Sequence, residues 1–394
     1  MNIDFITEQA KSIFPLTRDF RRHIHQNPEL SFAEYQTAEF IRTKLTEFGI
    51  DFITMANTGT VAHIGKGDIC VALRADIDAL PIIEETGLDF ASLNPGVMHA
   101  CGHDMHTSML LAAAKILKDN ESSLKGTVKL IFQPGEEKLP GGAKIMIDEG
   151  VLENPKPAAI FGQHIYPSEN SGTISVTGGP VFASTDELYW TVKGRGTHAA
   201  QPHLGSDAIL ASSQLINYYQ TILTKFKNPL DSCVLSVTSI HGGSATNIFP
   251  EEVKMMGTLR TYNEVLRTEI HDILMNNSEK MTQLYGCSCS VDIVKGYPAL
   301  INSHELAALV KETAINTVGV NNTLDFKPIM WAEDFAYYSM NIPACFWLLG
   351  VRPDNLSEMP PLHNSRLNPS EEAMINGTAM LVSSAINFLN NKNI

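Results

Sequence analysis

The chain has 394 residues, more than one ordinary hydrophobic core accommodates, so two domains are expected. A net charge of −14 leaves no basic stripe for phosphates, which argues against nucleic-acid binding. The amino terminus lacks the pattern of a secretion signal, and no apolar run reaches the ~18 residues of a membrane helix. We therefore expect a cytoplasmic protein without membrane attachment. Its six scattered cysteines are too sparse for a disulfide scaffold.

In the first part of the chain, helical and strand patterns alternate. Apolar residues spaced by about 3.6 positions predict helices over residues 33–48 and 104–118. Short apolar runs predict strands over residues 69–77, 126–133 and 158–166. Strands that alternate with helices predict βαβ units and a mainly parallel sheet, which usually carries ligands at the carboxyl ends of its strands.

The middle of the chain has a different order of elements. Strand, helix, strand, strand, helix and strand are predicted in turn over residues 187–194, 206–226, 232–240, 252–261, 264–284 and 287–295. This β-α-β-β-α-β order is that of ferredoxin-like domains. A helix, a strand and a helix then follow over residues 304–317, 344–349 and 369–390. We therefore expect a catalytic domain of residues 1–184 and 296–394, interrupted by an inserted domain of residues 185–295.

The segment His-Ala-Cys-Gly-His-Asp-Met-His, residues 99–106, lies between a predicted strand and a predicted helix. Cys101 and His103 can face one metal ion if the backbone turns between them, and Gly102 permits such a turn. Taken alone, the segment fits a buried cysteine and a helix-capping Asp104 equally well. We interpret His106, one turn further on, as helix packing or support for a ligand.

Two adjacent carboxylates, Glu136 and Glu137, follow a predicted strand and a Pro-Gly turn. Side chains of neighbouring residues diverge, so one glutamate can bind a metal while the other faces the substrate and transfers protons. The alternative is a solvated acidic pair at the start of the next helix, where negative charge is favourable.

Two lone histidines, His164 and His363, complete the set of candidate metal ligands. His164 ends an apolar strand, and His363 lies in a loop before the last helix. Each would more often be a structural residue than a ligand. Together with Cys101, His103 and Glu137, however, they make five ligands, which exceed one tetrahedral zinc and suit two metal ions.

Further motifs occur in order at residues 21–30, 73–81, 196–203, 247–250, 333–336 and 362–364. Together with the segments above, they make nearly the whole chain resemble the metallopeptidase family of aminoacylases and glutamate carboxypeptidases. Within that family it is most similar to the amidohydrolase subfamily of hippurate hydrolases, auxin-conjugate hydrolases and N-acetyl-diaminopimelate deacetylases. The resemblance implies an α/β, two-metal hydrolase domain with an inserted ferredoxin-like lid domain, and metal-dependent hydrolysis of N-acyl amino acids.

The resemblance also implies roles for individual residues. Glu136 would be the general base, and Asp78 would support the ligands from behind. Two divalent ions, of zinc, manganese, cobalt or nickel, would be bound by Cys101, His103, Glu137, His164 and His363. Cys101 stands where other branches of the family have a bridging aspartate, so a thiolate that bridges the two ions is a hypothesis that the sequence alone does not decide.

The same resemblance assigns substrate binding and dimerisation to the inserted domain. His198 and Asn247 would stabilise the developing oxyanion, with His198 coming from the partner subunit of a homodimer. Arg260 would bind the substrate's carboxylate, although it also fits a charge on the surface of a strand. Two other functions stay open: a dipeptidase with the same machinery, and a non-catalytic protein that binds an amide metabolite.

Overall fold

The computed structural model describes residues 1–391, and the chain forms two compact units. The first unit comprises Met1–Val181, Ile301–Lys327 and Asp334–Ile394. The second comprises Phe182–Leu300 and Pro328–Glu333. Two short strands, β7 (Gly179–Phe182) and β12 (Leu300–Asn302), lie where the chain passes from one unit to the other.

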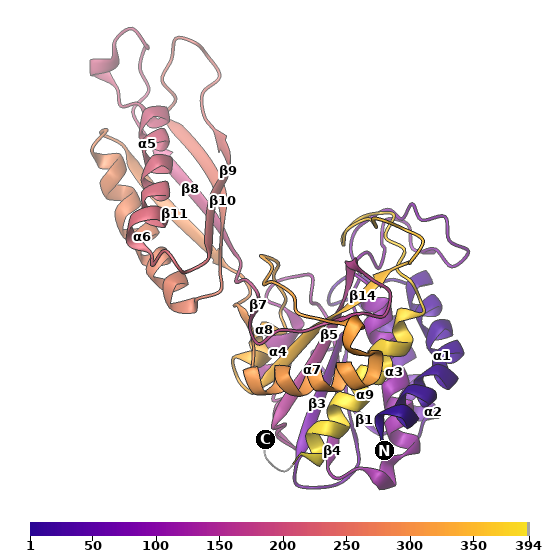
Figure 1. Cartoon of the computed structure of the whole chain (residues 1–394). Coiled ribbons are helices and arrows are strands. Elements are labelled where there is room, and N and C mark those ends of the chain that lie inside the picture. Colours follow the sequence, from indigo (N-terminus) through magenta and orange to yellow (C-terminus); the bar gives the residue numbers. More distant parts are fainter. Residues whose placement is uncertain (392–394) are drawn as a thin grey trace. The chain divides into compact units, whose positions relative to one another are not determined.

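The first unit is built on an eight-stranded sheet with the order β1-β2-β4-β3-β5-β14-β6-β13 (Figure 1). The bounds of these strands are β1 Phe52–Met55, β2 Gly59–Ile64, β3 Cys70–Asp76, β4 Thr127–Gln133, β5 Ala159–Asn170, β6 Ile174–Ser175, β13 Thr323–Leu324 and β14 Ala344–Arg352. The four central strands, β4, β3, β5 and β14, run parallel. Every residue of β3 and β4 is buried, as expected for parallel strands covered on both faces. The mainly parallel sheet predicted from the sequence is confirmed.

The helices of the first unit include two long ones that pack on the central strands. α3 and α9 both contact β3, and α1 packs against both of these helices. The helices are α1 Ile3–Gln26, α2 Tyr35–Glu47, α3 His103–Asp119, α4 Gly142–Asp148, α7 His304–Val318, α8 Ala336–Ser339 and α9 Ala373–Asn390, with short 3-10 turns at Glu121–Ser123 and Val320–Asn322. Among residues 1–391, no helix is both long and apolar enough to cross a membrane.

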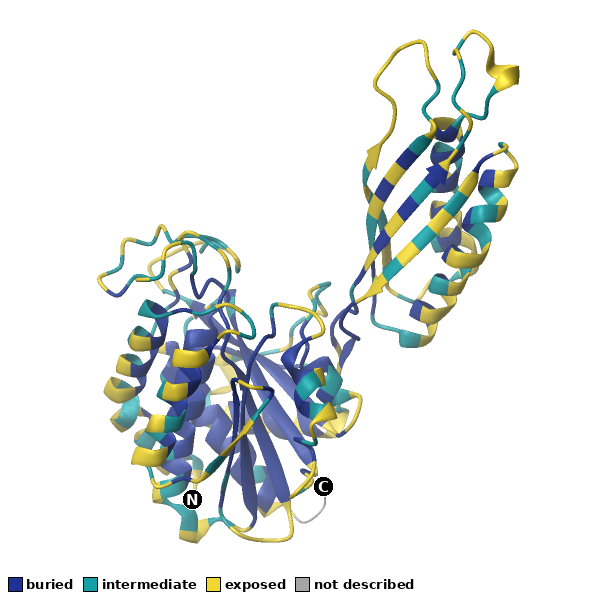
Figure 2. Cartoon of the chain, turned by 180° about the vertical axis from the view of Figure 1, so that it is seen from behind, coloured by how far each residue is buried: buried dark blue, intermediate teal, exposed yellow. Residues whose placement is uncertain are grey.

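The second unit contains an antiparallel sheet with the order β11-β8-β10-β9. Its elements are β8 Asp186–Lys193, a 3-10 turn Pro202–Leu204, α5 Ala208–Thr221, a π-helical turn Ile222–Phe226, β9 Cys233–His241, β10 Glu252–Thr261, α6 Glu264–Gln283 and β11 Ser288–Lys295. Buried and exposed residues alternate along β8, in contrast to the uniformly buried β3 and β4 of the first unit (Figure 2). This is the ferredoxin-like β-α-β-β-α-β arrangement predicted from the sequence.

Candidate metal centre

The sequence-predicted ligands gather near the carboxyl ends of the central strands of the first unit. β3 and β4 end beside each other, with Asp76 opposite Gln133 in the register. The segments that follow these strands therefore start side by side, and they carry Asp78 and the pair Glu136–Glu137. His164 lies on the neighbouring strand β5. This is the edge at which parallel sheets commonly bind ligands.

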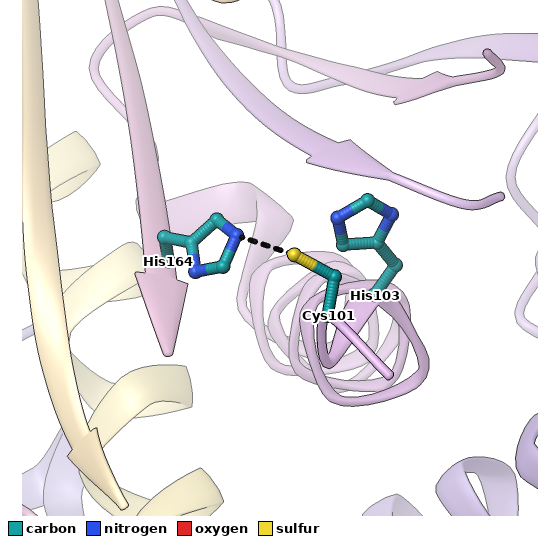
Figure 3. Close-up of side chains that lie close together, drawn as sticks. All are labelled: Cys101, His103 and His164. Atoms are coloured by element: carbon teal, nitrogen blue, oxygen red, sulfur yellow. Dashed lines mark hydrogen bonds between the residues drawn. The ribbon is translucent and has the colours of Figure 1, made fainter. Parts of the chain in front are cut away.

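The first group of candidate ligands is Cys101, His103 and His164 (Figure 3). Their ligating atoms lie within 4.8 Å of one another, and all three residues are buried. The Cys101 Sγ atom is 3.4 Å from His164 Nε2. His164 Nδ1 lies 2.8 Å from the carbonyl oxygen of Ile165, so a proton on Nδ1 would be donated there and Nε2 would keep its lone pair. Burial and the neighbouring His106 hold the pKa of His164 well below its usual value, which favours the neutral, metal-binding form.

Gly102 makes the turn that lets Cys101 and His103 face one centre. Its φ is +84°, and it immediately precedes the first residue of α3. A Cβ atom at this position would lie 2.2 Å from the Ile165 side chain. Both the backbone conformation and the space therefore require glycine, as the sequence motif predicts.

The second group adds Glu137 and His363 to Cys101, with the three ligating atoms again within 4.8 Å of one another. Glu137 Oε1 lies 3.2 Å from His363 Nε2 and 4.0 Å from His103 Nε2. The His363 backbone, at φ +63°, is tied by its N–H to the carbonyl oxygen of Ala100 at 2.8 Å. The His363 side chain is 52% exposed, so the cluster is open to solvent on this side.

Asp78 contacts two of the candidate ligands, His103 and Glu137, through atoms that do not face the cluster. Its Oδ1 atom lies 3.2 Å from His103 Nδ1, and its Oδ2 atom accepts the backbone N–H of Glu137 at 2.9 Å. Burial opposes ionisation of Asp78, but the hydrogen bond and charge of His103, together with the hydrogen bonds from Ser31 and the Glu137 N–H, outweigh it and lower the pKa of the carboxyl. With its Nδ1 proton held by Asp78, His103 presents Nε2 to the cluster, an arrangement that commonly orients a metal-binding imidazole.

The electrostatics of the cluster fit a bound cation. Burial lowers the pKa of His103, but Asp76, Asp78 and Glu137 together raise it to about 10. Burial and the charges of Glu137 and Glu136 raise the pKa of the Cys101 thiol well above its usual value. The site therefore has an excess of negative charge, and a divalent ion would favour both the neutral imidazole and the thiolate.

Two buried polar atoms of the cluster point to the same conclusion. No group of residues 1–391 forms a hydrogen bond with His103 Nε2 or Glu137 Oε1, although both atoms are buried. Buried polar atoms are almost always paired, so unpaired ones in a set of thiol, imidazole and carboxylate groups suit a metal. The residues present therefore fit a divalent-metal centre.

Asp76 and His106 lie next to the cluster but are occupied by other partners. His106 Nδ1 is 2.6 Å from Asp76 Oδ1, while its Nε2 accepts the backbone N–H of Ile165 at 2.9 Å. Both ring nitrogens are therefore used within the protein. His106 supports β5 beside His164, in agreement with its interpretation as a supporting residue.

A buried network around Arg74 was not assigned from the sequence. The Arg74 guanidinium donates to Asp76 Oδ2 and to Asp334 Oδ1, each at 2.7 Å. Gln133 also donates to Asp334 at 2.8 Å, and the backbone N–H of Asp334 is 3.4 Å from Glu136 Oε1. The position of Arg74 within the apolar run 69–77 could have indicated this network from the sequence, because a buried guanidinium requires charged or polar partners.

The remaining sequence-predicted site residues lie in the second unit. His198 and Asn247 line one pocket of about 560 Å³, bounded by residues 196–198 and 247–251. The two segments are joined by the backbone hydrogen bond from Ala199 N to Asn247 O, at 2.9 Å. Arg260 lies on β10 opposite Val234 and, within the described residues, is not part of the pocket lining.

Comparison with known proteins identifies the family. The model of peptidase family M20/M25/M40 matches residues 72–387. The chain belongs to this family. An N-acetyl-L-cysteine deacetylase of Bacillus subtilis is 40% identical over 368 residues, which cover 93% of this chain and 86% of that protein. IAA-amino acid hydrolase ILR1-like 5 of Arabidopsis thaliana is 36% identical over 375 residues, covering 94% and 86% of the two chains.

A solved structure supports the same family and fold. The YXEP protein of Bacillus subtilis, described as a dinuclear metal-binding peptidase of the M20 family, superposes with a TM-score of 0.83 at 32% identity. The match covers 96% of this chain and 99% of YXEP. The protein is thus a hydrolase of the M20 family with amidohydrolase and deacetylase relatives.

Proposed function

We propose that this hydrolase cleaves the amide bond of N-acyl amino acids, with an acetyl, benzoyl or aryl-acyl group, and releases a carboxylate and a free amino acid. The observation that carries the proposal is the position of Glu136. It is 7% exposed, and a carboxylate oxygen lies within 4.8 Å of ligating atoms of both His103 and Glu137. A carboxylate beside the ligand cluster suits a general base. The deacetylase and IAA-amino acid hydrolase relatives support the choice of substrate class.

In this proposal the ligand cluster holds two divalent ions, bound by Cys101, His103, Glu137, His164 and His363. Zinc, manganese, cobalt and nickel are the candidates, and a thiol at 3.4 Å from an imidazole favours the softer of them. When bound, the ions would hold a water molecule, lower its pKa and polarise the amide carbonyl. Cys101, which the resemblance places at a bridging position, belongs to both groups of candidate ligands and would help to hold both ions.

The chain's own groups then carry the proton transfers. Glu136 removes a proton from the attacking water and later gives it to the leaving amine, which departs as a neutral amino group. Asp78 keeps His103 and the Glu137 backbone in place during this exchange, through the contacts described above. Because Glu136 is buried, its carboxylate acts in a region of low dielectric, where its effect on the reacting water is larger than in solution.

Three residues of the second unit are proposed to recognise the substrate. His198 and Asn247 would stabilise the oxyanion, and their common pocket supports a joint role. Arg260 would bind the free carboxylate of the amino acid through a two-point contact. The second unit would thus serve as a lid that excludes water during the reaction.

We further propose a homodimer formed through this lid. β9 is an edge strand of the second unit, and its Val234 and Ile240 side chains are 37% and 46% exposed. An exposed apolar edge strand is suited to pairing with a second copy. Light scattering on the purified protein is expected to give twice the chain mass; a monomer at micromolar concentration would contradict the dimer.

The experiment that tests the function is a substrate panel on metal-reconstituted protein. The panel contains N-acetyl, N-benzoyl and indole-acetyl amino acids, N-acetyl-diaminopimelate and dipeptides, and free amino acid is the product measured. Glu136→Ala is expected to bind metal as the wild type does but to lose at least about a hundredfold in kcat. Glu8→Ala, at an exposed glutamate of α1, is the matched control and should be fully active.

The outcomes separate the alternatives. Cleavage of dipeptides but not of acyl amino acids would favour a dipeptidase. Metal binding without any turnover would favour a metabolite-binding protein. Substantial turnover by Glu136→Ala would contradict the role of Glu136.

A further inference from the structure

The loop of residues 29–34, between α1 and α2, packs against the segments that carry the candidate catalytic carboxylates. We call it the amino-terminal loop. Its backbone pairs with the segment after β3: the Glu29 carbonyl oxygen accepts the N–H of Ala79 at 2.8 Å, and Leu30 forms a bridge with Ala79. The loop is thereby fixed next to Asp78, and two of its side chains reach further.

The first of these side chains is Glu34, which is fully buried. Glu34 Oε1 accepts the backbone N–H of Gly135 and that of Phe32, each at 2.8 Å. Its other carboxyl oxygen accepts the hydroxyl of Thr58 at 2.7 Å. Gly135 directly precedes Glu136 in the chain, so Glu34 binds the backbone immediately before the proposed general base.

The same turn is covered by the Phe32 ring. Gly135 has a φ of +62°, and a Cβ atom there would lie 2.3 Å from Phe32 Cε1. Phe32 itself has a φ of +65°, a conformation that a bulky residue seldom adopts. Such backbone outliers persist only where the surroundings hold them, and they cluster near functional sites.

The second side chain that reaches the site is Ser31. Its hydroxyl donates to Asp78 Oδ2 at 2.6 Å, the same oxygen that accepts the N–H of Glu137. The amino-terminal loop is therefore connected to the turn before Glu136 through Glu34, and to Glu137 through Ser31 and Asp78.

A carboxyl group at position 34 is an unfavourable choice for stability alone. Burial, followed by the nearby charge of Asp78, raises the pKa of Glu34 to about 7. Ionising the group therefore costs the folded state free energy. Oε1 nevertheless accepts the Gly135 N–H whether the carboxyl is protonated or not. The carboxyl therefore stabilises the turn at Gly135 in both states.

We propose that Glu34 is a positioning residue, which holds the Gly135–Glu137 turn through the Gly135 N–H and thereby orients Glu136 toward the reacting water. The inference rests on the proposed function of Glu136. It adds to the site a residue that lies about a hundred positions away in the sequence and touches neither substrate nor metal. Small displacements of a reacting group are enough to reduce a rate strongly.

The test compares Glu34→Ala, Glu34→Gln and Thr58→Val. Glu34→Ala removes the acceptor of the Gly135 N–H, so kcat is expected to fall about tenfold or more while KM changes less than about twofold. Glu34→Gln can present its carbonyl oxygen to Gly135 and its amide to Thr58, and it should restore most of kcat. Thr58→Val removes a different bond to the same carboxyl and should lower the melting temperature without changing kcat.

A second readout does not depend on turnover. Hydrogen exchange of the backbone amides of residues 135–137, followed in metal-free protein by mass spectrometry, should be faster in Glu34→Ala but not in Thr58→Val. If Glu34→Ala does not fold, Glu34→Asp decides in its place, because it keeps the charge but shortens the reach to Gly135.

Unchanged exchange and unchanged kcat in Glu34→Ala would overturn the proposal. So would a loss of kcat in Thr58→Val as large as that in Glu34→Ala, since it would reflect general destabilisation. A wild-type protein that cleaves no member of the substrate panel would refute the proposed function instead, and the exchange measurement would still decide whether Glu34 holds the turn.

Discussion

Both units of this protein bury charged side chains, but the ligand cluster of the first unit differs from the buried Arg267 cluster of the second. In the second unit, Arg267 is fully buried and every guanidinium nitrogen donates a hydrogen bond, to Asp186, Glu264, or the carbonyl oxygens of Thr185 and Gly296. In the first unit, His103 Nε2 and Glu137 Oε1 are buried without a hydrogen-bond partner among residues 1–391.

This difference between paired and unpaired buried groups indicates which group has a structural role and which binds a ligand. A buried charge with all its partners inside the protein fixes the local structure, as Arg267 does between β8 and α6. Buried polar atoms that converge without partners are costly unless something else binds them. The unpaired set lies at the carboxyl ends of parallel strands, the edge at which parallel sheets commonly bind ligands. The similar YXEP protein is described as a dinuclear metal-binding peptidase.

The largest stability effect is expected at the paired cluster. Arg267→Leu leaves the Asp186 charge buried with fewer partners, so we expect a loss of about 3–5 kcal/mol in the free energy of unfolding. Urea unfolding followed by circular dichroism would measure it. Lys254→Met, at an exposed ion pair of the same unit, is the control and should cost less than about 1 kcal/mol. Equal losses in the two variants would contradict the structural role of the Arg267 cluster.

A smaller effect, on metal affinity, is expected when Asp78, which supports the ligand cluster, is changed. Asp78→Asn removes the charge that holds His103 Nδ1 and weakens the acceptor for the Glu137 N–H, so zinc affinity should fall about 10–100-fold. Competition with a chelator of known affinity is the measurement. Asp119→Asn, at the exposed end of α3, should leave the affinity unchanged; the same affinity in both variants would argue against support by Asp78.

The third prediction concerns the pH dependence of stability. Glu34 has a pKa of about 7 in the folded protein, above its usual value, so its contribution to stability is lost as the pH rises through that range. Glu34→Gln cannot ionise and should therefore gain stability relative to the wild type between pH 5 and pH 8, by at most about 3 kcal/mol. Thermal unfolding of the metal-free proteins at both pH values tests this. A stability difference that does not change with pH would show that Glu34 does not ionise in this range.

Many of the strands and helices, and part of the candidate site, were predictable because they depend on local sequence patterns. The apolar runs that predict strands over residues 69–77 and 126–133 correspond to β3 and β4 within one residue at each end. Cys101, His103 and Glu137 follow or precede regular elements, so the parallel order of the strands was sufficient to expect them together. The order of elements in the second unit was likewise readable from alternating and helical periodicities.

Other features depend on contacts that no local pattern reveals. The helix α1 was not predicted, and it contains Pro15, a residue that usually interrupts helices. The last helix was expected from residue 369 but begins at Ala373, after Pro369. Glu34 and Asp334 reach the turn around Glu136 from distant loops, and only the three-dimensional structure pairs them with it.

The central claim is that the ligand cluster of the first unit, which contains the buried and unpaired His103 Nε2 and Glu137 Oε1, binds two divalent ions. Anomalous diffraction at the zinc absorption edge, from crystals of zinc-reconstituted protein, tests it most directly. We predict two peaks about 3.5–4 Å apart, surrounded by the side chains of Cys101, His103, Glu137, His164 and His363. No peak in this cluster, or zinc bound only elsewhere in the molecule, would contradict the claim.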